Sequence, residues 1–301
     1  MVTFELNGKL IQTDADKNLL TFLRKDMGIK SAKDGCSEGA CGTCSVLVDG
    51  VSRRACTLQV QKLDGKRIVT VEGLSDYEKQ VYAYCFAKAG AVQCGFCIPG
   101  MLISAKALLD KNLSPTRKEV AQALVGNICR CTGYQKIFDA ILMAAEFFRE
   151  HKEVPEYKTT GRIAEDVLRI DAYAKTLGTG EYVDDMELPD MVFASAVRSA
   201  YPRAVVEDID VSEALAYPGV IAVITAEDIP GHNKHGHLVK DWDVLIAKGD
   251  TTRYVGDAIA LVVAETEEAL AEAKKLVKIS YTPLEPITSP RMALEEGAPK
   301  L

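Results

Sequence analysis

The sequence has no hydrophobic run that approaches the roughly 20 residues a membrane-spanning helix needs, so no membrane partner is expected. Its first residues have neither the basic nor the apolar segment of a secretory signal, which predicts a cytoplasmic protein. Basic residues form no stripe and are outnumbered, 36 against 43 acidic residues, for a net charge of −7. This charge balance argues against a nucleic-acid partner. A composition of 48% hydrophobic and 26% charged residues is ordinary for a globular chain.

Cysteine is absent from residues 132–301 and abundant before them. The nine cysteines are Cys36, Cys41, Cys44, Cys56, Cys85, Cys94, Cys97, Cys129 and Cys131. An odd number, tight spacings and the lack of an export signal disfavour a disulfide framework. We therefore expect the clustered cysteines to bind metal.

Residues 1–75 are predicted to form a small α+β domain. Asn7-Gly8 and Asp49-Gly50 each separate two strand-like segments, which is the pattern of a two-residue hairpin turn. Apolar residues recur at helical spacing over 19–23, and residues 51–56 and 67–71 are expected to be strands.

Residues 76–150 are predicted to form four short helices, which suggests a bundle. Ser75-x-x-Glu78 is a possible capping box, and Pro99 suits the first turn of a second helix. Ser114-Pro115 is expected to open the third helix, and the fourth begins near Tyr134. The remaining clustered cysteines fall in the loops after the first and third helices.

Residues 151–160 form a polar, proline-containing linker, and residues 161–301 are predicted to be a third, α/β domain. Its expected strands are 192–197, 205–209, 220–224, 258–263 and 277–281, and a helix follows Thr266. The predicted fold class is therefore α+β with several domains. Because no Gly-x-Gly-x-x-Gly follows a strand, no flavin or nicotinamide site is assigned.

The first cysteine group has the spacing of a plant-type [2Fe–2S] ferredoxin. Cys36-x4-Cys41-x2-Cys44 lies in one loop, and Cys56 is expected from the next hairpin. Glycines within the loop allow the backbone to fold tightly and to direct N–H groups at the anionic cluster. A structural zinc site is the alternative, but zinc sites usually take their ligands as two separated pairs.

The second cysteine group consists of two pairs, Cys94 with Cys97 and Cys129 with Cys131. Each pair precedes an expected helix start, so two helix N-termini with free N–H donors would face one anionic cluster. The spacing alone also permits zinc or a disulfide.

The residues around the second group resemble the iron–sulfur part of the molybdenum hydroxylases, the family of xanthine dehydrogenase and aldehyde oxidoreductase. The matching segments are Ala-Val-Gln-Cys-Gly-Phe-Cys-Ile-Pro-Gly-Met at 91–101 and Gly-Asn-Ile-Cys-Arg-Cys-Thr-Gly-Tyr at 126–134. The resemblance implies a β-grasp, ferredoxin-like domain over residues 1–75 and a four-helix-bundle domain over residues 76–150. Each domain would hold one [2Fe–2S] cluster.

The similarity continues more loosely beyond the linker. Arg169-x-Asp171-Ala-x-x-Lys175-x-x-Gly178 and Tyr182-Val-Asp184-Asp185 look like the opening of the family's molybdenum-binding part. The segment Tyr254-Val-Gly-Asp-Ala-Ile-Ala-Leu-Val-Val-Ala264 looks like a later strand of its α/β hammerhead domain. These matches are interpreted as core strands and turns, and no chemistry is assigned to them.

The resemblance also implies the roles of individual residues. In this family the bundle cluster lies beside the pterin of the molybdenum cofactor, and the positions that match Gln93 and Cys131 contact that pterin. A surface amide ahead of a turn is the alternative for Gln93. Electrons would leave singly through the cluster of Cys94, Cys97, Cys129 and Cys131, and then through that of Cys36, Cys41, Cys44 and Cys56.

The family's molybdenum centre, cofactor loops and glutamate base are expected outside residues 1–301, so no catalytic residue is assigned to this chain. The expected partners are the remaining molybdenum-binding domains or subunit, and an FAD subunit or a soluble electron acceptor. The full enzyme is expected to be a homo-oligomer. Its substrate, whether a purine, an aldehyde or another N-heterocycle, is not determined by these residues.

Two other functions are considered: a self-standing two-cluster electron carrier with an appended protein-binding domain, and a zinc-stabilised interaction module. Cys85 is expected to be a buried small hydrophobic residue on a helix. The group His232-x2-His235-x-His237 is interpreted as a solvated loop rather than a metal site, and Trp242 as a loop anchor.

Overall fold

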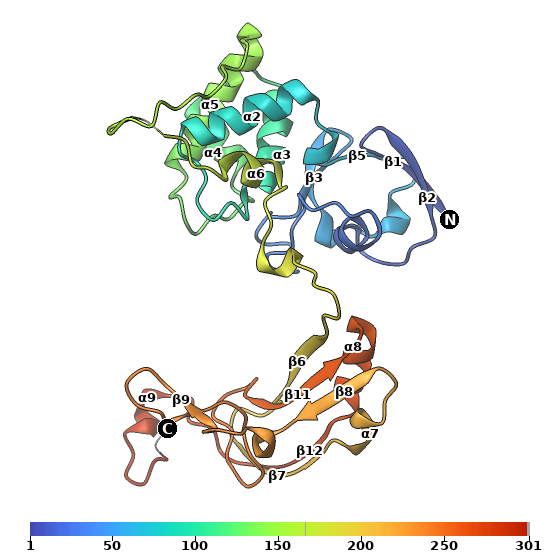
Figure 1. The fold of residues 1–301 in the computed structure, drawn as a ribbon, viewed down its shortest axis with the longest axis vertical. Coiled ribbons are helices and arrows are strands. Elements are labelled where there is room, and N and C mark those ends of the chain that lie inside the picture. Colours follow the sequence, from blue (N-terminus) through green and yellow to red (C-terminus); the bar gives the residue numbers. More distant parts are fainter. Residues whose placement is uncertain (166, 300–301) are drawn as a thin grey trace. The chain divides into compact units, whose positions relative to one another are not determined.

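The computed structural model describes residues 1–165 and 167–299, which fall into two compact units. The first unit ends at Asp185 and the second begins at Met186. The first contains a mixed sheet followed by a group of helices, and the second contains small antiparallel sheets with short helices (Figure 1). No helix in the described residues is long and apolar enough to cross a membrane.

The first unit opens with a five-stranded sheet in the order β2-β1-β5-β3-β4. The strands are β1 (Val2–Leu6), β2 (Lys9–Thr13), β3 (Ser45–Val48), β4 (Val51–Arg54) and β5 (Arg67–Val69). Strands β1 and β5 are parallel, and the other neighbouring strands are antiparallel. Both predicted hairpins are confirmed: Asn7, Gly8, Asp49 and Gly50 all have φ between +50° and +80°, as tight hairpin turns require.

Two predicted strands are shorter in the structure. The strand expected over 51–56 ends at Arg54, because Ala55–Thr57 form a 3₁₀ turn that carries Cys56. The strand expected over 67–71 ends at Val69, before a second 3₁₀ turn at Val71–Gly73. In both cases a short helical turn redirects the chain away from the sheet.

The predicted helix after residue 18 covers one face of this sheet. It begins as α1 (Leu19–Thr21), whose first turn is capped by Asn18, and continues as a wider π-type turn over Phe22–Asp26. Leu19, Leu23 and Phe4 are fully buried together, and the rings of Phe4 and Phe22 meet edge to face at 5.9 Å. This is the β-grasp arrangement that the family resemblance implies.

The rest of the first unit is helical, with α2 (Asp76–Lys88), α3 (Ile98–Leu109), α4 (Arg117–Ala123), α5 (Gln135–Glu150) and α6 (Ala172–Leu177). The capping box of Ser75 and Glu78 is confirmed. The expectation that Ser114 caps α4 is wrong, because Thr116 and Glu119 form the capping box of that helix two residues later.

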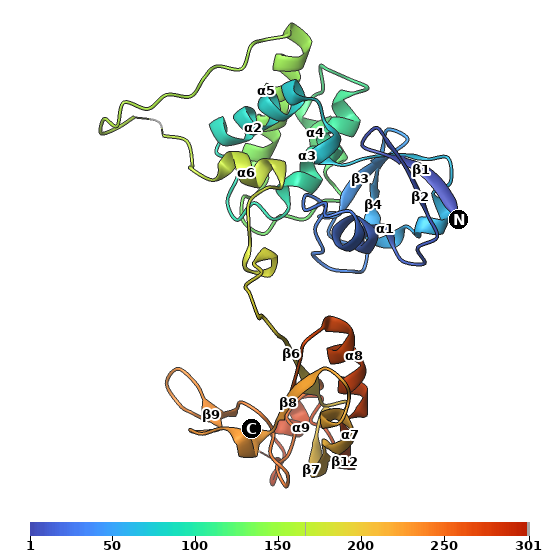
Figure 2. The same cartoon turned by 45° about the vertical axis from the view of Figure 1, so that its right-hand side comes forward.

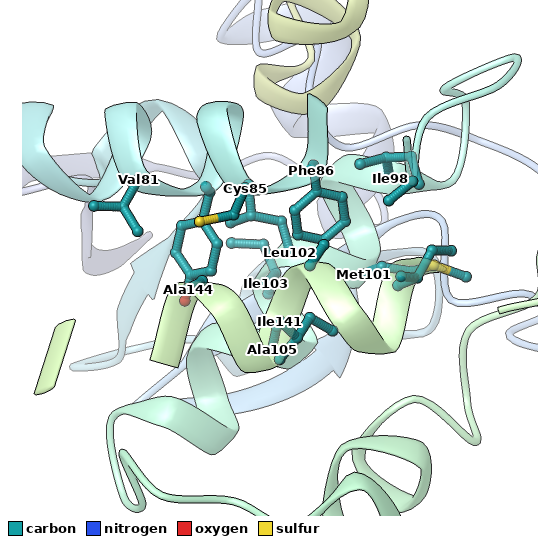
Figure 3. Packing of buried hydrophobic residues seen from close by; sticks show 14 of the residues in the cluster. Val81, Cys85, Phe86, Ile98, Met101, Leu102, Ile103, Ala105, Ile141 and Ala144 are labelled. Atoms are coloured by element: carbon teal, nitrogen blue, oxygen red, sulfur yellow. The ribbon is translucent and has the colours of Figure 1, made fainter. Parts of the chain in front are cut away.

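The core of the bundle lies between α2, α3 and α5 (Figure 3). In Figure 3 the side chains of Cys85 and Phe86 point from α2 toward the other two helices, and both are fully buried. The prediction that Cys85 is a buried hydrophobic residue is therefore confirmed. Burial raises the pKa of this thiol to about 12.

Residues beyond the linker return to the bundle. Helix α6 packs against α2 and α3 and places residues 172–185 in the first unit (Figure 2). The first part of the segment that the sequence assigns to the third domain thus lies in the first unit.

Within the described residues, the second unit has three small antiparallel sheets, in the orders β6-β11-β8, β12-β7 and β10-β9. Its strands are β6 (Phe193–Arg198), β7 (Ala204–Asp210), β8 (Val220–Ile224), β9 (Lys234–His235), β10 (Trp242–Asp243), β11 (Ala258–Ala264) and β12 (Lys278–Pro283). Its helices are α7 (Ser212–Leu215), α8 (Glu267–Leu276) and α9 (Pro290–Ala293). The five predicted strands are present, and the predicted helix α8 begins at its Thr266 cap.

Candidate iron–sulfur sites

The first cysteine group forms a nest of four thiols beside the end of the β-grasp sheet. Cys36, Cys41 and Cys44 come from the loop before β3, and Cys56 comes from the 3₁₀ turn after β4. We call these four residues the ferredoxin nest. The amide of Ala55 donates to the carbonyl of Cys44 over 3.1 Å, which fixes the turn of Cys56 against the loop.

The ferredoxin nest is arranged as two pairs of sulfurs. The side chain of Cys36 lies near that of Cys41, and the side chain of Cys44 lies near that of Cys56. The amide of Cys41 donates to the Cys36 Sγ over 3.4 Å, and the hydroxyl of Thr43 donates to the Cys41 Sγ over 3.3 Å. Such N–H and O–H donors stabilise thiolates and cluster sulfur.

The second cysteine group forms a nest at one end of the helical bundle. Cys94 and Cys97 lie in the loop between α2 and α3, and Cys129 and Cys131 lie in the loop between α4 and α5. We call these four residues the bundle nest. The Sγ atoms of Cys94 and Cys131 are 3.5 Å apart, and the side chains of Cys97 and Cys129 are also in contact. Cys97 is buried at the start of α3, whereas Cys94 and Cys131 are exposed.

Tyr134 holds the bundle nest in place from the start of α5. Its hydroxyl accepts a hydrogen bond from the amide of Cys129 over 2.8 Å and donates to the carbonyl of Asn127 over 3.2 Å. Tyr134 itself has a φ of +68°, a left-handed conformation that turns the chain from the cysteine loop into the helix.

The buried thiols of the two nests need a positive charge to ionise. Burial raises the pKa of Cys44 to about 12 and also raises that of Cys97, because burial disfavours a thiolate. In contrast, backbone N–H groups, chiefly that of Cys41, lower the pKa of Cys36 to about 7. Iron bound to all four sulfurs would supply the charge that protein atoms do not.

The pairing of the sulfurs fits a two-iron cluster better than a single metal ion. Two thiolates on one tetrahedral metal with bonds of about 2.3 Å lie about 3.8 Å apart, close to the 3.5 Å between the sulfurs of Cys94 and Cys131. A single zinc ion would draw all four sulfurs of a nest to that spacing. In the described part of the chain, no three Cys, His, Asp or Glu side chains converge on one metal position. A [2Fe–2S] cluster instead takes two sulfurs at each iron.

The two nests are linked through the backbone. The amide of Ile128, next to Cys129, donates to the carbonyl of Cys41 over 2.8 Å. Gly42 approaches the opposite loop so closely that a Cβ atom there would lie 2.2 Å from the carbonyl oxygen of Gly126. The loop that carries Cys41 is therefore in direct contact with the loop that carries Cys129.

Lys33 lies buried close to the bundle nest, and sequence reasoning missed it. Its side chain is 3% exposed, and its ammonium has no hydrogen-bond partner within residues 1–165 and 167–299. The ammonium lies 6.0 Å from the ring centroid of Phe96, inside the Cys94–Cys97 loop, and 5.7 Å from that of Tyr182. Burial lowers the pKa of Lys33 to about 8. A buried cation of this kind suits a site where anionic clusters bind.

Helix α6 and the segment after it contact the Cys94–Cys97 loop of the bundle nest. The hydroxyl of Tyr182 donates to the carbonyl of Cys94 over 2.8 Å, and its ring meets that of Phe96 edge to face at 5.3 Å. A Cβ atom on Gly95 would lie within 2.8 Å of the side chain of Lys175. From the sequence pattern, no chemistry is assigned to residues 169–185. In the structure, Tyr182 of this segment contacts Cys94, a predicted metal ligand.

The other predicted residues lie apart from the two nests or at their edge. Gln93 is exposed beside Cys94, so its amide is accessible to a ligand. His232, His235 and His237 are all exposed; His235 lies in the short strand β9, and the other two lie in the neighbouring loops. Trp242 packs against Tyr254 and under the guanidinium of Arg253, whose carbon lies 5.3 Å from the indole centroid.

Three family models match successive parts of the chain. A 2Fe-2S iron-sulfur cluster binding domain matches residues 17–80, and a [2Fe-2S] binding domain matches residues 70–142. The aldehyde oxidase and xanthine dehydrogenase a/b hammerhead domain matches residues 177–285. The chain thus has two [2Fe–2S]-binding domains, and the predicted fold class is confirmed.

Known proteins resemble the chain in two ways. Aldehyde oxidoreductase from Megalodesulfovibrio gigas is 36% identical over 304 residues, which cover 95% of this chain and 34% of that protein. The nicotinate dehydrogenase small FeS subunit from Eubacterium barkeri is 47% identical over 148 residues, which cover 48% of this chain and 94% of that subunit.

Solved structures give the same result. The aldehyde oxidoreductases of Desulfovibrio gigas and Desulfovibrio desulfuricans superpose with TM-scores of 0.85 and 0.86, at 33% and 31% identity. Each covers 99% of this chain, which in turn covers 35% of either enzyme. The chain thus spans about a third of the length of the aldehyde oxidoreductases that it matches. On this evidence the chain belongs to the molybdenum hydroxylase family of xanthine dehydrogenase and aldehyde oxidoreductase.

Proposed function

We propose that the chain is the electron-conducting part of a molybdenum-dependent hydroxylase. In this proposal electrons pass singly from a molybdenum–pterin centre to the bundle nest, then to the ferredoxin nest, and then to an external acceptor. The observation that carries the proposal is the presence of two nests of four paired thiols in one compact unit, joined by the hydrogen bond between Ile128 and Cys41. All eight cysteines are proposed ligands.

The order of the two nests is supported by their exposure. Cys94 and Cys131 present their sulfurs at the surface, and Gln93 is exposed next to them. We place the pterin contact at Gln93 and Cys131, because an amide can both donate to and accept from the edge of a heterocycle. Cys131 would then contact the pterin and ligate the cluster at once.

The clusters would supply reversible one-electron redox chemistry, and the protein would tune it. The chain's own residues hold the sulfurs in pairs, donate N–H and O–H groups to them, and place the cation of Lys33 nearby. The donors and the cation each favour the more negative, reduced state of a cluster.

The proposed partners follow from the relatives. The nicotinate dehydrogenase and nicotine 6-hydroxylase relatives are named small subunits, and the chain covers 94% and 88% of them. We propose that the remaining molybdenum-binding domains or subunit complete the enzyme, and that an FAD subunit or soluble carrier accepts the electrons. A homo-oligomeric, cytoplasmic enzyme belongs to the same proposal. The domain boundaries 1–75, 76–150 and 161–301 do too, with residues 172–185 of the third segment packed in the first unit.

A self-standing electron carrier with an appended binding domain is less well supported. Residues 177–285 match the hammerhead domain of aldehyde oxidase and xanthine dehydrogenase rather than an unrelated binding domain. The part of the chain beyond the linker therefore favours an enzyme over a free carrier.

The test replaces one ligand of the bundle nest. Cys94→Ser should abolish the electron paramagnetic resonance signal of the bundle cluster in the reduced protein and leave the ferredoxin-type signal intact. Cys85→Ala is the matched control, because Cys85 is buried in the helix core and belongs to neither nest, and it should retain both signals. If Cys94→Ser retains both signals, the assignment of the bundle nest is wrong.

A further inference from the structure

Asn127 lies at the contact between the two nests and is a ligand of neither. It precedes Ile128 and Cys129, and its side chain is only 4% exposed. Its backbone carbonyl accepts from the hydroxyl of Tyr134, the residue that also accepts from the amide of Cys129. The backbone of Asn127 is thereby tied to the bundle nest.

The side chain of Asn127 is tied to the ferredoxin nest. Its Nδ2 donates to the carbonyl of Gly42, between Cys41 and Cys44, over 2.9 Å. Its Oδ1 accepts from the hydroxyl of Ser104 on α3 over 2.8 Å. The amide orientation is determined by chemistry, because the carbonyl of Gly42 can only accept.

We propose that Asn127 is a positioning residue that sets the rate of electron transfer between the two clusters. It holds Gly42 and Cys41 against the segment that leads to Cys129, so that the Cys41 carbonyl accepts from the Ile128 amide over 2.8 Å. That hydrogen bond connects the covalent backbone of Cys41 to that of Ile128 and Cys129, and so completes a through-bond route between the sulfurs of Cys41 and Cys129. The inference rests on the proposed function.

The step is a one-electron exchange. One electron leaves the bundle cluster, where a ferrous iron becomes ferric, and enters the ferredoxin cluster, where a ferric iron becomes ferrous. In the test, a photoreduced flavin supplies the electron, and no proton or atom is transferred between the nests.

The glycines around Asn127 show how closely the two loops pack. A Cβ atom on Gly42 would lie 2.8 Å from the Asn127 Nδ2, and one on Gly100 of α3 would lie 2.5 Å from the carbonyl oxygen of Gly42. Without the Asn127 amide, the Gly42 carbonyl keeps the N–H and O–H of Ser45 as donors, at 3.1 and 2.7 Å. Loss of the amide should therefore loosen the contact between the loops without unfolding either of them.

The experiment compares Asn127→Leu with the unchanged chain, both loaded with clusters under anaerobic conditions. Leucine has the same branching and the same number of side-chain heavy atoms as asparagine, but it neither donates to Gly42 nor accepts from Ser104. After flash reduction with the photoreduced flavin, the redistribution of the first electron between the clusters should slow severalfold, because loss of the amide loosens the contact that holds the Cys41 carbonyl against the Ile128 amide. The spin–spin splitting between the two fully reduced clusters should also decrease.

Two further variants make the result decisive. Ser104→Ala removes the hydroxyl that donates to the Asn127 Oδ1 and lies 3.1 Å from the hydroxyl of Ser52, but it leaves the Asn127 donor to Gly42 in place. It should slow the redistribution less, which provides a second test should Asn127→Leu fail to hold its clusters. Asn112→Leu is the matched control, because Asn112 accepts from the amide of Ser114 in the loop after α3 and contacts neither nest, and it should leave the rate unchanged.

The inference is overturned if Asn127→Leu retains both the electron-redistribution rate and the spin–spin splitting of the unchanged chain. If Asn127→Leu lacks clusters, the same outcome for Ser104→Ala overturns it. Iron and acid-labile sulfide analysis separates this failure from that of the proposed function. If the unchanged chain holds no clusters, the proposed function fails, whereas two intact clusters with an unaltered rate refute the role of Asn127 alone.

Discussion

The contact between the two nests makes a sharp prediction for Gly42→Ala. Gly42 has a φ of +69°, and a Cβ atom there would lie 2.2 Å from the carbonyl oxygen of Gly126. The left-handed conformation costs a non-glycine residue roughly 1–2 kcal/mol. The collision adds about 1–3 kcal/mol, because the opposing atom belongs to the backbone and no side chain can rotate away. We expect Gly42→Ala to lower the stability of the cluster-loaded chain by about 2–5 kcal/mol.

Gly65→Ala provides the control for this prediction. Gly65 has nearly the same φ, +67°, but no atom of the described residues lies within 4 Å of the place a Cβ would take, so only the conformational cost applies. The assay is urea-induced loss of the visible circular dichroism of the clusters, under anaerobic conditions, for both variants. Equal destabilisation by Gly42→Ala and Gly65→Ala would refute the close contact between the nests.

Three further predictions concern single side chains. Tyr134→Phe removes the hydroxyl that accepts from the Cys129 amide, so the free energy of unfolding in a urea titration should fall by about 1 kcal/mol. In electron paramagnetic resonance, the signal of the bundle cluster should shift and the ferredoxin-type signal should not. Cys85 should resist iodoacetamide at pH 8 in the folded chain, since its pKa is raised to about 12. It should react only after unfolding or at a pH close to that pKa, as measured by peptide mass spectrometry. Lys33→Met removes a buried cation, so the reduction potentials of the clusters in a redox titration should fall by an amount on the order of tens of millivolts. Lys30 is exposed, and Lys30→Met should leave both potentials unchanged.

Local sequence signals predict much of the fold. Asn7-Gly8 and Asp49-Gly50 specify hairpins because their backbones reach positive φ at low cost, and both hairpins form. Strand ends are less predictable: β4 stops at Arg54 because a 3₁₀ turn brings Cys56 toward the other thiols. That turn depends on the nest as a whole rather than on local propensity.

Cysteine spacing and motif divide eight of the nine cysteines into two groups, and the structure brings the members of each group together. That they ligate iron stays a prediction. The residues that support the nests are not predictable in this way. Lys33, Asn127 and Tyr182 act on segments distant in the sequence, and only the folded chain places them there. The alternating hydrophobic pattern that reveals a strand carries no information on such contacts.

The most direct test of the account is iron and acid-labile sulfide analysis of the anaerobically prepared chain. The account predicts two iron atoms and two sulfides for each of the two [2Fe–2S]-binding domains, together with red-brown absorbance. A colourless chain that contains zinc, or that contains no acid-labile sulfide, would contradict it.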